Sequence, residues 1–439
     1  MEFLDTILFA ILLILGFGFF ALNVKKIIRN IKLGQNVNRY DNPSSRWKNM
    51  ALIALGQQKM VKKPVMGILH IIVYVGFVII NIELLEIVID GLFGTHRIFA
   101  FLPFYNFLIA SFEILAFLVL VAVIIFWTRR NVIKLKRFIS SDLNGWPRSD
   151  ANYILYFEVV LMTLFLLMNA SDLFLQKAHF SHYHEAGFFP ISQYLASFFN
   201  GFSLQNVALF ERIVWWLHIT GILIFANYLY FSKHLHILLA FPNTYFADLN
   251  VEGKFDNLAS VTKEVKLMMD PSADPFAVTA DDTIVPSKFG AADVQDLNWV
   301  QLLNAYTCTE CGRCTDACPA NTTGKKLSPR KIMMQTRDRL EEVGKNIDKN
   351  KGVFIPDNKT LLNDYITTEE LWACTSCNAC VQECPVNISP LSIILDMRRY
   401  LVMEQSAAPM SLNAMMTNIE NNGAPWQYNQ QDRLNWATE

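Results

Sequence analysis

Cysteine is confined to one short part of this chain. No cysteine occurs before position 308 or after position 384 of the 439 residues. Disulfide scaffolds are typical of short secreted chains, so a disulfide framework is not expected. Charge is also scarce, with 18% charged against 52% hydrophobic residues, and the net charge of −1 gives no reason to expect nucleic acid. No glycine-rich nucleotide fingerprint occurs, so we expect neither NAD nor FAD to bind this chain.

The apolar residues are concentrated in the first 240 positions. Five segments there are long enough to span a bilayer, which takes about 20 residues. They are Phe3–Val24, Pro64–Ile89, Tyr105–Trp127, Tyr153–Leu175 and Val207–Phe231. A further apolar stretch, Phe188–Phe202, is interrupted by Pro190 and Gly201, which predicts an interfacial helix with loops. We therefore expect a mainly α protein whose residues 1–240 form a transmembrane five-helix domain.

The basic residues predict how this domain is oriented. Lysine and arginine gather in the loops Lys25–Lys63 and Arg129–Arg148, whereas the other two connections hold Arg97 and Lys177. Loops rich in basic residues face the cytoplasm. The N-terminus is therefore expected outside, and the chain after residue 240 in the cytoplasm, where thiols stay reduced.

The eight cysteines form two runs with the spacing C-x2-C-x2-C-x3-C-P. This spacing is typical of proteins with two 4Fe-4S clusters, in which the fourth cysteine of each run binds the other cluster. Zinc is the alternative for eight thiolates, but zinc sites do not require triples followed by Cys-Pro. The predicted ligands are Cys308, Cys311, Cys314 and Cys384 for the first cluster, and Cys374, Cys377, Cys380 and Cys318 for the second.

Helical patterns flank the cysteine runs. The stretches SPRKIMMQTRDRLEEVG and SPLSIILDMRRYLVMEQ predict amphipathic helices with a Ser-Pro start. We expect a linker at 241–296 and an α-helical ferredoxin domain with two 4Fe-4S clusters at 297–405. The remaining residues, 406–439, are rich in Asn and Gln and predict an extended, exposed tail suited to wrapping a partner chain.

The histidines of the membrane half suggest haem. His218 and His236 are 18 residues apart, which is five turns on one face of a continuous helix. His70 lies near the cytoplasmic end of the second segment, so His70 and His236 are predicted to bind haem b at one depth. The alternative is that these histidines only form hydrogen bonds within the bundle. His218 has Ile80 opposite it, which leaves a five-coordinate haem, an unidentified ligand or no haem; His234 points away from His218.

Acidic residues within the spans are costly and are usually functional. Glu83 and Glu86 lie on the outer half of the second segment and could form a proton path to a quinone site. With Asp172 they could also form part of an ion pump, and solvation by head groups is the structural alternative. The outer-loop histidines are predicted to be surface residues, with metal ligation or proton relay as alternatives; they are His179, His182 and His184.

These motifs resemble a known family. LSPRK and LWACTSCNACVQECPVNISPLSIILDMRRYLV resemble the ferredoxin domain of heterodisulfide-reductase-type proteins. The five spans resemble the haem b subunit of respiratory nitrate reductase, and the fusion of the two halves resembles bacterial membrane-bound electron-transfer-flavoprotein:quinone oxidoreductases. Two features depart from that family. No cysteine-rich CCG motif is present, and the second span has one histidine, His70, where the family has two.

The resemblance implies a function. It implies a subunit in the bacterial cytoplasmic membrane that passes electrons between a cytoplasmic partner and menaquinone or another quinone, through two 4Fe-4S clusters and one or two haems b. The partner would be an electron-transfer flavoprotein, a CCG-domain subunit or both. No catalytic side chain is needed, because the cofactors supply the chemistry. The alternatives are a quinol-linked subunit that reduces a disulfide or sulfur compound, and a non-redox assembly subunit.

Overall fold

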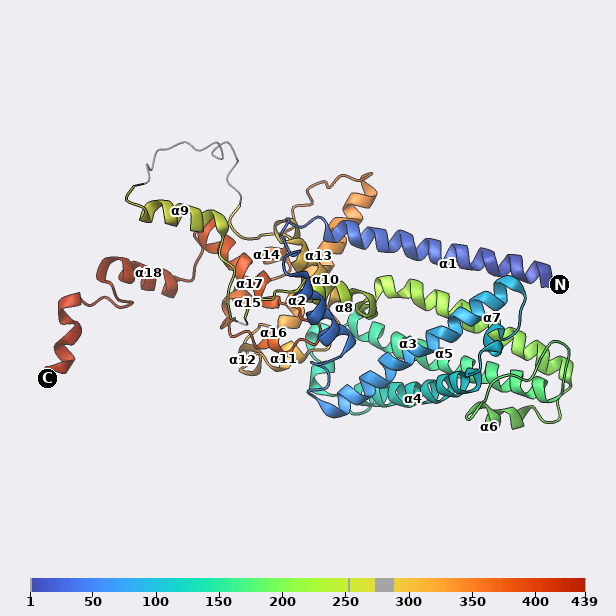
Figure 1. Ribbon diagram of the computed structural model, residues 1–439. Helices are drawn as coiled ribbons and strands as arrows, with labels where there is room; N and C mark the ends of the chain where they lie inside the picture. The colour runs from blue at the N-terminus through green and yellow to red at the C-terminus, as the bar shows by residue number, and fades with distance from the viewer. Residues whose placement is uncertain (1, 252, 273–287, 439) are drawn as a thin grey trace.

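The computed structural model describes residues 2–251, 253–272 and 288–438, and its regular elements are helices (Figure 1). The described part contains only two isolated bridges of extended chain, Gln35 with Asn298 and Leu362 with Ile366. Five helices are long and apolar enough to cross a membrane. They are α1 (Glu2–Ile31), α3 (Pro64–Phe93), α4 (Tyr105–Asn131), α5 (Trp146–Lys177) and α7 (Leu204–Tyr228). Each of the first four contains one predicted span, and the fifth predicted span is covered by α7 with the 3-10 turn Leu229–Phe231 that follows it. The expected mainly α class is confirmed.

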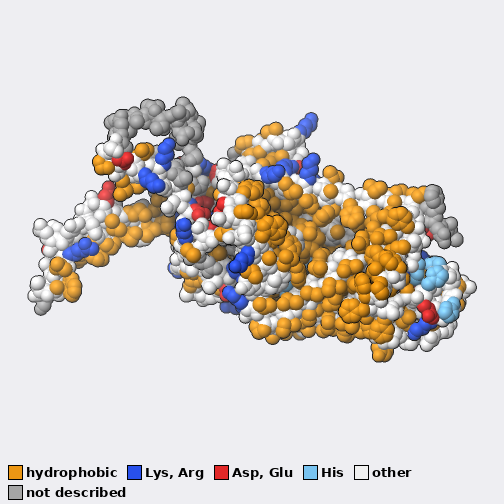
Figure 2. Space-filling view, viewed as in Figure 1, with side chains coloured by type: hydrophobic (Ala, Val, Ile, Leu, Met, Phe, Trp, Pro, Cys, Tyr) orange, Lys and Arg blue, Asp and Glu red, His pale blue; other side chains and the backbone are white. Residues whose placement is uncertain are grey.

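The five long helices pack as a bundle. Helix α5 contacts α4 and α7, α3 contacts α4, and α1 lies across α3 and α7. Close approach depends on small residues, as is usual where apolar helices pack without water. A Cβ atom on Gly91 of α3 would lie 2.5 Å from the ring of Phe9 on α1. The outer surface of the bundle is largely hydrophobic (Figure 2).

Short elements connect the spans at both ends of the bundle. The outer stretch folds as α6 (Ser192–Ala196) and a 3-10 turn at Ser197–Phe199, as expected for an interfacial segment. At the opposite end, α2 (Pro43–Met50) and a π-helical turn at Ala51–Leu55 pack against α8 (His236–Tyr245). Arg46 of α2 is buried there and donates hydrogen bonds to the carbonyl oxygens of Tyr245 and Ala247.

The cysteine half is a small helical domain. Its three longer helices are α10 (Trp299–Thr307), α13 (Pro329–Lys349) and α17 (Pro390–Arg399), and each begins at a capping side chain that accepts from the first turn, Asn298, Ser328 and Ser389. Between them lie short helices: α11 (Arg313–Asp316), α12 (Pro319–Thr322), α14 (Leu361–Asp364), α15 (Thr368–Trp372) and α16 (Ala379–Glu383). Three of the cysteines lie in the apolar core of this domain: Cys308, Cys318 and Cys384.

Two predicted boundaries differ from the structure. The ferredoxin core already includes Ala291, whose N–H donates to the carbonyl oxygen of Asp396 at 3.0 Å, so the domain begins before residue 297. The expected linker contains the second half of α8, which begins before it at His236, and an exposed helix, α9 (Ala259–Met269). Its residues 273–287 lie outside the described part.

The tail is exposed as expected, but the prediction that it is extended is wrong. It forms α18 (Met410–Asn422) and a 3-10 helix at Gln430–Ala437, which project away from the rest of the molecule (Figure 1). A stretch rich in Asn and Gln can still form a helix, because Leu, Met and Ala between these residues favour that conformation.

Helix α1 reaches beyond the bundle and packs on the ferredoxin domain, against α10 and α13. The side-chain amide of Asn30 donates to the hydroxyl of Tyr306 at 2.9 Å, and Arg29 donates to the carbonyl oxygen of Gly344 at 3.1 Å. Helices α1 and α13 approach so closely that a Cβ atom at Gly344 would lie 2.5 Å from the side-chain amide nitrogen of Asn30. The first span is therefore also a support for the cysteine domain.

Candidate functional site

The two cysteine runs have the same backbone geometry. In the first run Glu310 and Gly312 have positive φ angles of 53° and 77°, and in the second run the equivalent Ser376 and Asn378 have 55° and 60°. This left-handed conformation is favoured by glycine and tolerated by asparagine. Each loop then enters a one-turn helix, α11 or α16, and these two helices pack against each other. The runs thus face each other as two copies of one motif.

The packing of these loops sorts the eight free cysteines into two neighbouring sets. Burial raises the pKa of Cys314 well above its usual value, and the nearby thiols of Cys311, Cys308 and Cys384 raise it further. Cys380 is an additional neighbour of Cys314, so the two sets adjoin.

The second set is built in the same way. Burial raises the pKa of Cys380 to about 12, with added contributions from Cys374, Cys318 and Cys377. Each set therefore brings three cysteines of one run to the fourth cysteine of the other. These are the two groupings that the spacing predicts, although the structure does not by itself identify ligands.

The donor chemistry fits iron–sulfur clusters. Thiols that are buried together are difficult to ionise unless a positive metal centre compensates them. Backbone N–H groups also point at sulfur: that of Ser376 donates to Cys374 at 3.4 Å, and that of Ile388 donates to Cys384 at 3.3 Å. Hydrogen bonds to the sulfurs are one of the means by which proteins adjust cluster potentials.

A cavity of about 510 Å³ runs from these loops into the bundle, between α3, α4, α5, α7 and α8. Four histidines line it: His70, His218, His234 and His236. At the end next to the ferredoxin domain its wall includes Cys311 and Arg313, and the basic residues Arg129, Arg130 and Arg137. The structure thus brings the predicted pair His70 and His236 to one cavity that also reaches the first cysteine run.

The prediction that His218 and His236 lie on one continuous helix is wrong. Helix α7 ends at Tyr228, and two 3-10 turns, Leu229–Phe231 and Lys233–Leu235, follow before α8 begins at His236. Between the turns Ser232 is extended, with φ −115° and ψ 146°, and its hydroxyl accepts from the N–H of His234. Serine favours such local bonds over a continuous helix. His236 still reaches the cavity because α8 starts beside it.

The ring of His236 is held in a defined orientation. Its Nδ1 donates to the carbonyl oxygen of Lys233 at 3.1 Å, which leaves Nε2 without that constraint. A metal-binding histidine commonly donates its second ring N–H in this way. Buried Nδ1 of His70 has no hydrogen-bond partner. The two imidazoles could therefore serve as haem ligands, and the arginines at this end of the cavity could pair with the carboxylates of such a group.

Two groups near this pair were not identified from the sequence. His234, which the helical pattern placed away from His218, lines the same cavity; its ring centroid lies 5.4 Å from that of His236. Its Nε2 lies 3.7 Å from Oε1 of Glu158 on α5. The signal available in the sequence was the intramembrane Glu158 itself, since a buried acid in a span usually has a partner.

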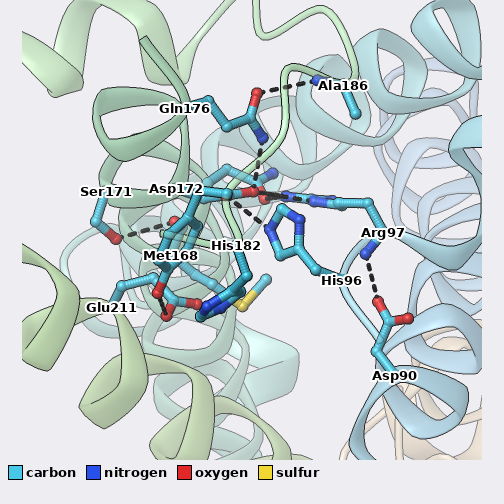
Figure 3. Close-up of polar contacts among 12 residues, drawn as sticks. Asp90, His96, Arg97, Met168, Ser171, Asp172, Gln176, His182, Ala186 and Glu211 are labelled. Atoms are coloured by element: carbon cyan, nitrogen blue, oxygen red, sulfur yellow. Dashed lines mark hydrogen bonds and ion pairs between the residues drawn. The ribbon is translucent and has the colours of Figure 1, made fainter. Parts of the chain in front are cut away.

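A second polar site lies at the end of the bundle remote from the cysteines. There the buried guanidinium of Arg97 donates to Glu83 Oε1 at 2.9 Å and to Asp172 Oδ2 at 2.9 Å. His96 Nε2 is 3.0 Å from Asp172 Oδ1 (Figure 3). In the sequence, Arg97 is recognisable only as a basic residue of a connection between two spans. Its burial was missed because hydropathy alone does not show that a loop folds back onto the bundle.

The outer-loop histidines gather at this same end. His179, His182 and His184 are exposed, as expected for surface residues. The ring of His182 lies 5.8 Å from that of His96 and 4.4 Å from that of Tyr183. Figure 2 shows histidine side chains at this end of the surface.

Comparison with known proteins identifies the relatives of this chain. Residues 307–388 match the model of the 4Fe-4S dicluster domain. The chain is 30% identical to a probable iron-sulfur-binding oxidoreductase, FadF, of Bacillus subtilis, over 99% of this chain and 61% of that protein. It is 25% identical to the EtfAB:quinone oxidoreductase of Syntrophomonas wolfei, over 92% of this chain and 55% of that protein. This chain thus spans less than two thirds of both relatives.

Further relatives match shorter parts of the chain. One component of the ferredoxin/F(420)H(2)-dependent CoB-CoM heterodisulfide reductase of Methanosarcina acetivorans is 32% identical over 24% of this chain and 52% of that protein. No solved structure matches the chain. The resemblance inferred from the sequence is confirmed: the homologues of this chain are FadF-like iron-sulfur oxidoreductases, EtfAB:quinone oxidoreductase and heterodisulfide reductase subunits, and the chain has their 4Fe-4S domain.

Proposed function

We propose that this chain is the membrane electron-transfer subunit that connects a cytoplasmic flavoprotein or iron–sulfur partner to the quinone pool. One observation supports this most strongly. The cavity in the bundle has Cys311 of the first run at one end and His70, His236 and His218 along its walls. An iron–sulfur protein that reacted only with soluble partners would have no use for such a cavity within apolar helices.

The cysteine sets are proposed to hold the two clusters with exchanged fourth ligands. Cys384 would complete the set of Cys308, Cys311 and Cys314, and Cys318 would complete the set of the second run. A 4Fe-4S cluster supplies one-electron transfer, and the two adjoining sets suit transfer between clusters. The residues of this chain bury the clusters, donate N–H groups to their sulfurs and exclude water.

His70 and His236 are proposed as the axial ligands of haem b. The haem would provide one-electron transfer within the membrane, next to the first cluster. The arginines at the inner end of the cavity would pair with its propionates, since planar guanidinium groups bind carboxylates well.

We infer the orientation from charge and from the position of the cysteine domain. The loops rich in basic residues lie at the end of the bundle where that domain packs: Lys59 donates to the carbonyl oxygen of Val381, and the carbonyl oxygen of Arg137 accepts from Arg330. Positively charged loops face the cytoplasm. The cysteine domain would then be cytoplasmic and the N-terminus outside, in a bacterial cytoplasmic membrane.

The partner is inferred from the relatives. One printed name is EtfAB:quinone oxidoreductase, which favours an electron-transfer flavoprotein as donor and menaquinone or a related quinone as acceptor. The heterodisulfide reductase relatives favour a second candidate, a quinol-linked subunit that delivers electrons to a CCG-domain partner for disulfide reduction.

The test is to purify the complex from membranes, identify the co-purifying chains, and record its reduced-minus-oxidised spectrum. We expect a b-type haem band, a cluster signal that quinone reoxidises, and a flavoprotein partner. A CCG partner with no flavoprotein would support the disulfide-reductase candidate. A complex without haem and without any quinone-dependent signal would contradict both and leave an assembly role.

A further inference from the structure

We propose that the outer end of the cavity binds a quinone head group, between Glu83 and His218, and that Glu83 exchanges the proton of the quinone reaction. This inference rests on the proposed quinone function and assigns it a location. Nothing in the comparisons places a substrate within the chain.

The two residues lie at the deep end of the cavity, far from the first pair of histidines. Glu83 is 13 residues beyond His70 on α3, which is about 20 Å along a helix. Glu83, His218 and Ile80 all line the cavity. Since the isoleucine side chain cannot bind iron, the second haem that His218 suggested lacks its partner at the expected position.

Both residues present polar atoms that the protein leaves unpartnered. Glu83 is 1% exposed and His218 is 3% exposed. The Oε2 atom of Glu83 and the Nδ1 atom of His218 are buried and have no hydrogen-bond partner. Within a membrane each such atom is costly, because no water can satisfy it. Two unsatisfied groups on the wall of one cavity indicate a polar ligand between them.

The surroundings select the class of ligand. Apart from these groups and Asn81 the wall here is apolar, with Phe165, whose ring centroid lies 6.0 Å from that of His218. A metal cation is disfavoured because Arg97 already occupies one oxygen of Glu83, which leaves a single carboxyl oxygen for a ligand. A quinone ring has two carbonyl oxygens on opposite edges and an apolar face, which matches a hydrogen-bonding group at each end of an apolar slot.

The cavity also reaches the lipid-facing side of the bundle. Its lining includes Phe77 and Val78, whose side chains are 46% and 53% exposed on the outer surface of α3. The exposed side chain of Asn81 lies close by and donates back to its own helix, at the carbonyl oxygen of Phe77. An isoprenoid tail could leave the cavity here while the ring stayed inside, as a lipid-soluble substrate requires.

Arg97 is the positioning residue of this site. Its Nη1 atom donates to Oε1 of Glu83 at 2.9 Å, which leaves Oε2 for the ligand. On its other side it binds Asp172, whose second oxygen is 3.0 Å from His96 (Figure 3). Arginine does not deprotonate, so Arg97 orders the carboxylates and does not itself transfer a proton. The partly exposed His96 gives this cluster contact with the surface remote from the cysteine domain.

The chemistry balances as follows. Reduction of one quinone to a quinol takes up two electrons and two protons. The electrons come from the iron–sulfur clusters of the complex, one at a time. Glu83 donates one proton to the nearer quinone oxygen, and the ring of His218 donates the other to the far oxygen. Both groups regain a proton before the next quinone binds, Glu83 from the side of Asp172 and His96. Oxidation of a quinol uses the same groups in reverse, with Oε2 of Glu83 accepting the proton.

The experiment compares Glu83→Gln with Glu86→Gln in the full complex. Glu86 lies one turn further along α3 and is equally buried, but it binds the Tyr105 hydroxyl and the N–H of Phe99 and does not line the cavity. Reduced benzyl viologen supplies electrons and 2,3-dimethyl-1,4-naphthoquinone accepts them. We expect Glu83→Gln to lower kcat by about 100-fold or more, as loss of a positioned proton donor does, and Glu86→Gln to stay within about twofold.

Two further measurements separate a functional role from a structural one. In Glu83→Ala, acetic acid should restore part of the lost rate, because a small acid can replace the missing donor. His218→Leu should weaken binding of the fluorescent quinol analogue 2-heptyl-4-hydroxyquinoline N-oxide by about tenfold, which corresponds to one lost hydrogen bond. Haem content and cluster signals should be unchanged in all of these variants.

Three results would overturn the inference. One is a Glu83→Gln variant with wild-type quinone kinetics. Another is loss of a haem in His218→Leu, which would show a second haem where we place the quinone. The third is a wild-type complex that transfers no electrons to quinone at all, which would also remove the proposed function; the first two results leave that function intact.

Discussion

Lys233 forms a buried ion pair with Glu310, where the segment after α7 meets the loop of the first cysteine run. Glu310 stands between Cys308 and Cys311, and Arg337 is its second partner at 2.8 Å. Burial opposes ionisation of this carboxyl, but the charges of Lys233 and Arg337 hold its pKa below the usual range. A charged carboxylate therefore lies beside the proposed first cluster, bound to the segment that leads to His236.

This ion pair should influence the potential of the first cluster. Glu310→Gln removes a negative charge near it, so the reduced state becomes easier to form and the midpoint potential should rise. Lys233→Met removes a positive charge, and the potential should fall. Each shift should be on the order of tens of millivolts, from the Coulomb energy of a charge at this range. Potentiometric titration followed by electron paramagnetic resonance measures both, and shifts of the same sign would contradict this account.

A surface pair in the same domain is the control for those variants. Lys326 and Glu369 form an ion pair whose side chains are 68% and 61% exposed. Water and salt screen such a pair. Lys326→Met should therefore leave both potentials where they are in the wild type.

The proposed haem ligands can be tested individually. His70→Ala and His236→Ala should each abolish the b-type band in the reduced-minus-oxidised spectrum, because bis-histidyl ligation needs both imidazoles. His234→Ala is the matched control, since His234 lines the same cavity but binds no haem in our proposal. Loss of the band in His234→Ala with retention in His236→Ala would show that the two assignments must be exchanged.

If the fourth cysteine of each run binds the cluster of the other run, substitutions in different runs should affect the same cluster. Cys384→Ser and Cys308→Ser should damage the same cluster and leave a remaining cluster with the same midpoint potential. Cys318→Ser should instead match Cys374→Ser. Iron content and redox titration of the four variants give the pairing. If Cys384→Ser behaved like Cys374→Ser, each run would hold its own cluster and our assignment would be wrong.

The contact between the cysteine domain and the loop after α4 should be important for stability. Arg330 of α13 is 1% exposed, and its guanidinium donates to both oxygens of Asp142 and to the carbonyl oxygen of Arg137. Arg330→Met leaves Asp142 without its countercharge, and loss of one partner of a buried pair costs about 3–5 kcal/mol. Thermal unfolding followed by cluster absorbance should show this loss. A variant as stable as Lys326→Met would mean that the contact adds no net stability.

The sequence was sufficient for features set by local spacing. The five spans follow from apolar runs longer than a bilayer, and the helices after LSPRK and NISP follow from their Ser-Pro starts. The exchanged cysteine sets follow from the C-x2-C-x2-C-x3-C-P spacing, and the packing of α11 against α16 is consistent with them. The spans and the helix starts depend on neighbouring residues, which a single sequence shows directly. The exchanged sets join residues as distant as Cys308 and Cys384 and follow from the motif itself.

The features that were missed depend on contacts between distant residues. The break at Ser232 was not predicted, because the helical period of 3.6 residues can be extended through this position when only the sequence is considered. The burial of Arg97 depends on Glu83 and Asp172, which belong to two other parts of the chain. No motif in the sequence distinguishes Glu310 from the other residues of the cysteine loop. Only the position of Lys233 in the structure shows that the carboxylate of Glu310 forms a buried ion pair.

The packing of α1 on the cysteine domain also has a consequence for the order in which the protein is assembled. Helix α1 is synthesised before α13 and the second cysteine run, because it precedes them in the chain. The contacts of Asn30 with Tyr306 and Gly344 can therefore form only after those later residues have been synthesised. The domain that receives iron and sulfide acquires its full support only after α1 is in place, so we expect cofactor loading to be a late step of biogenesis that takes place at the membrane.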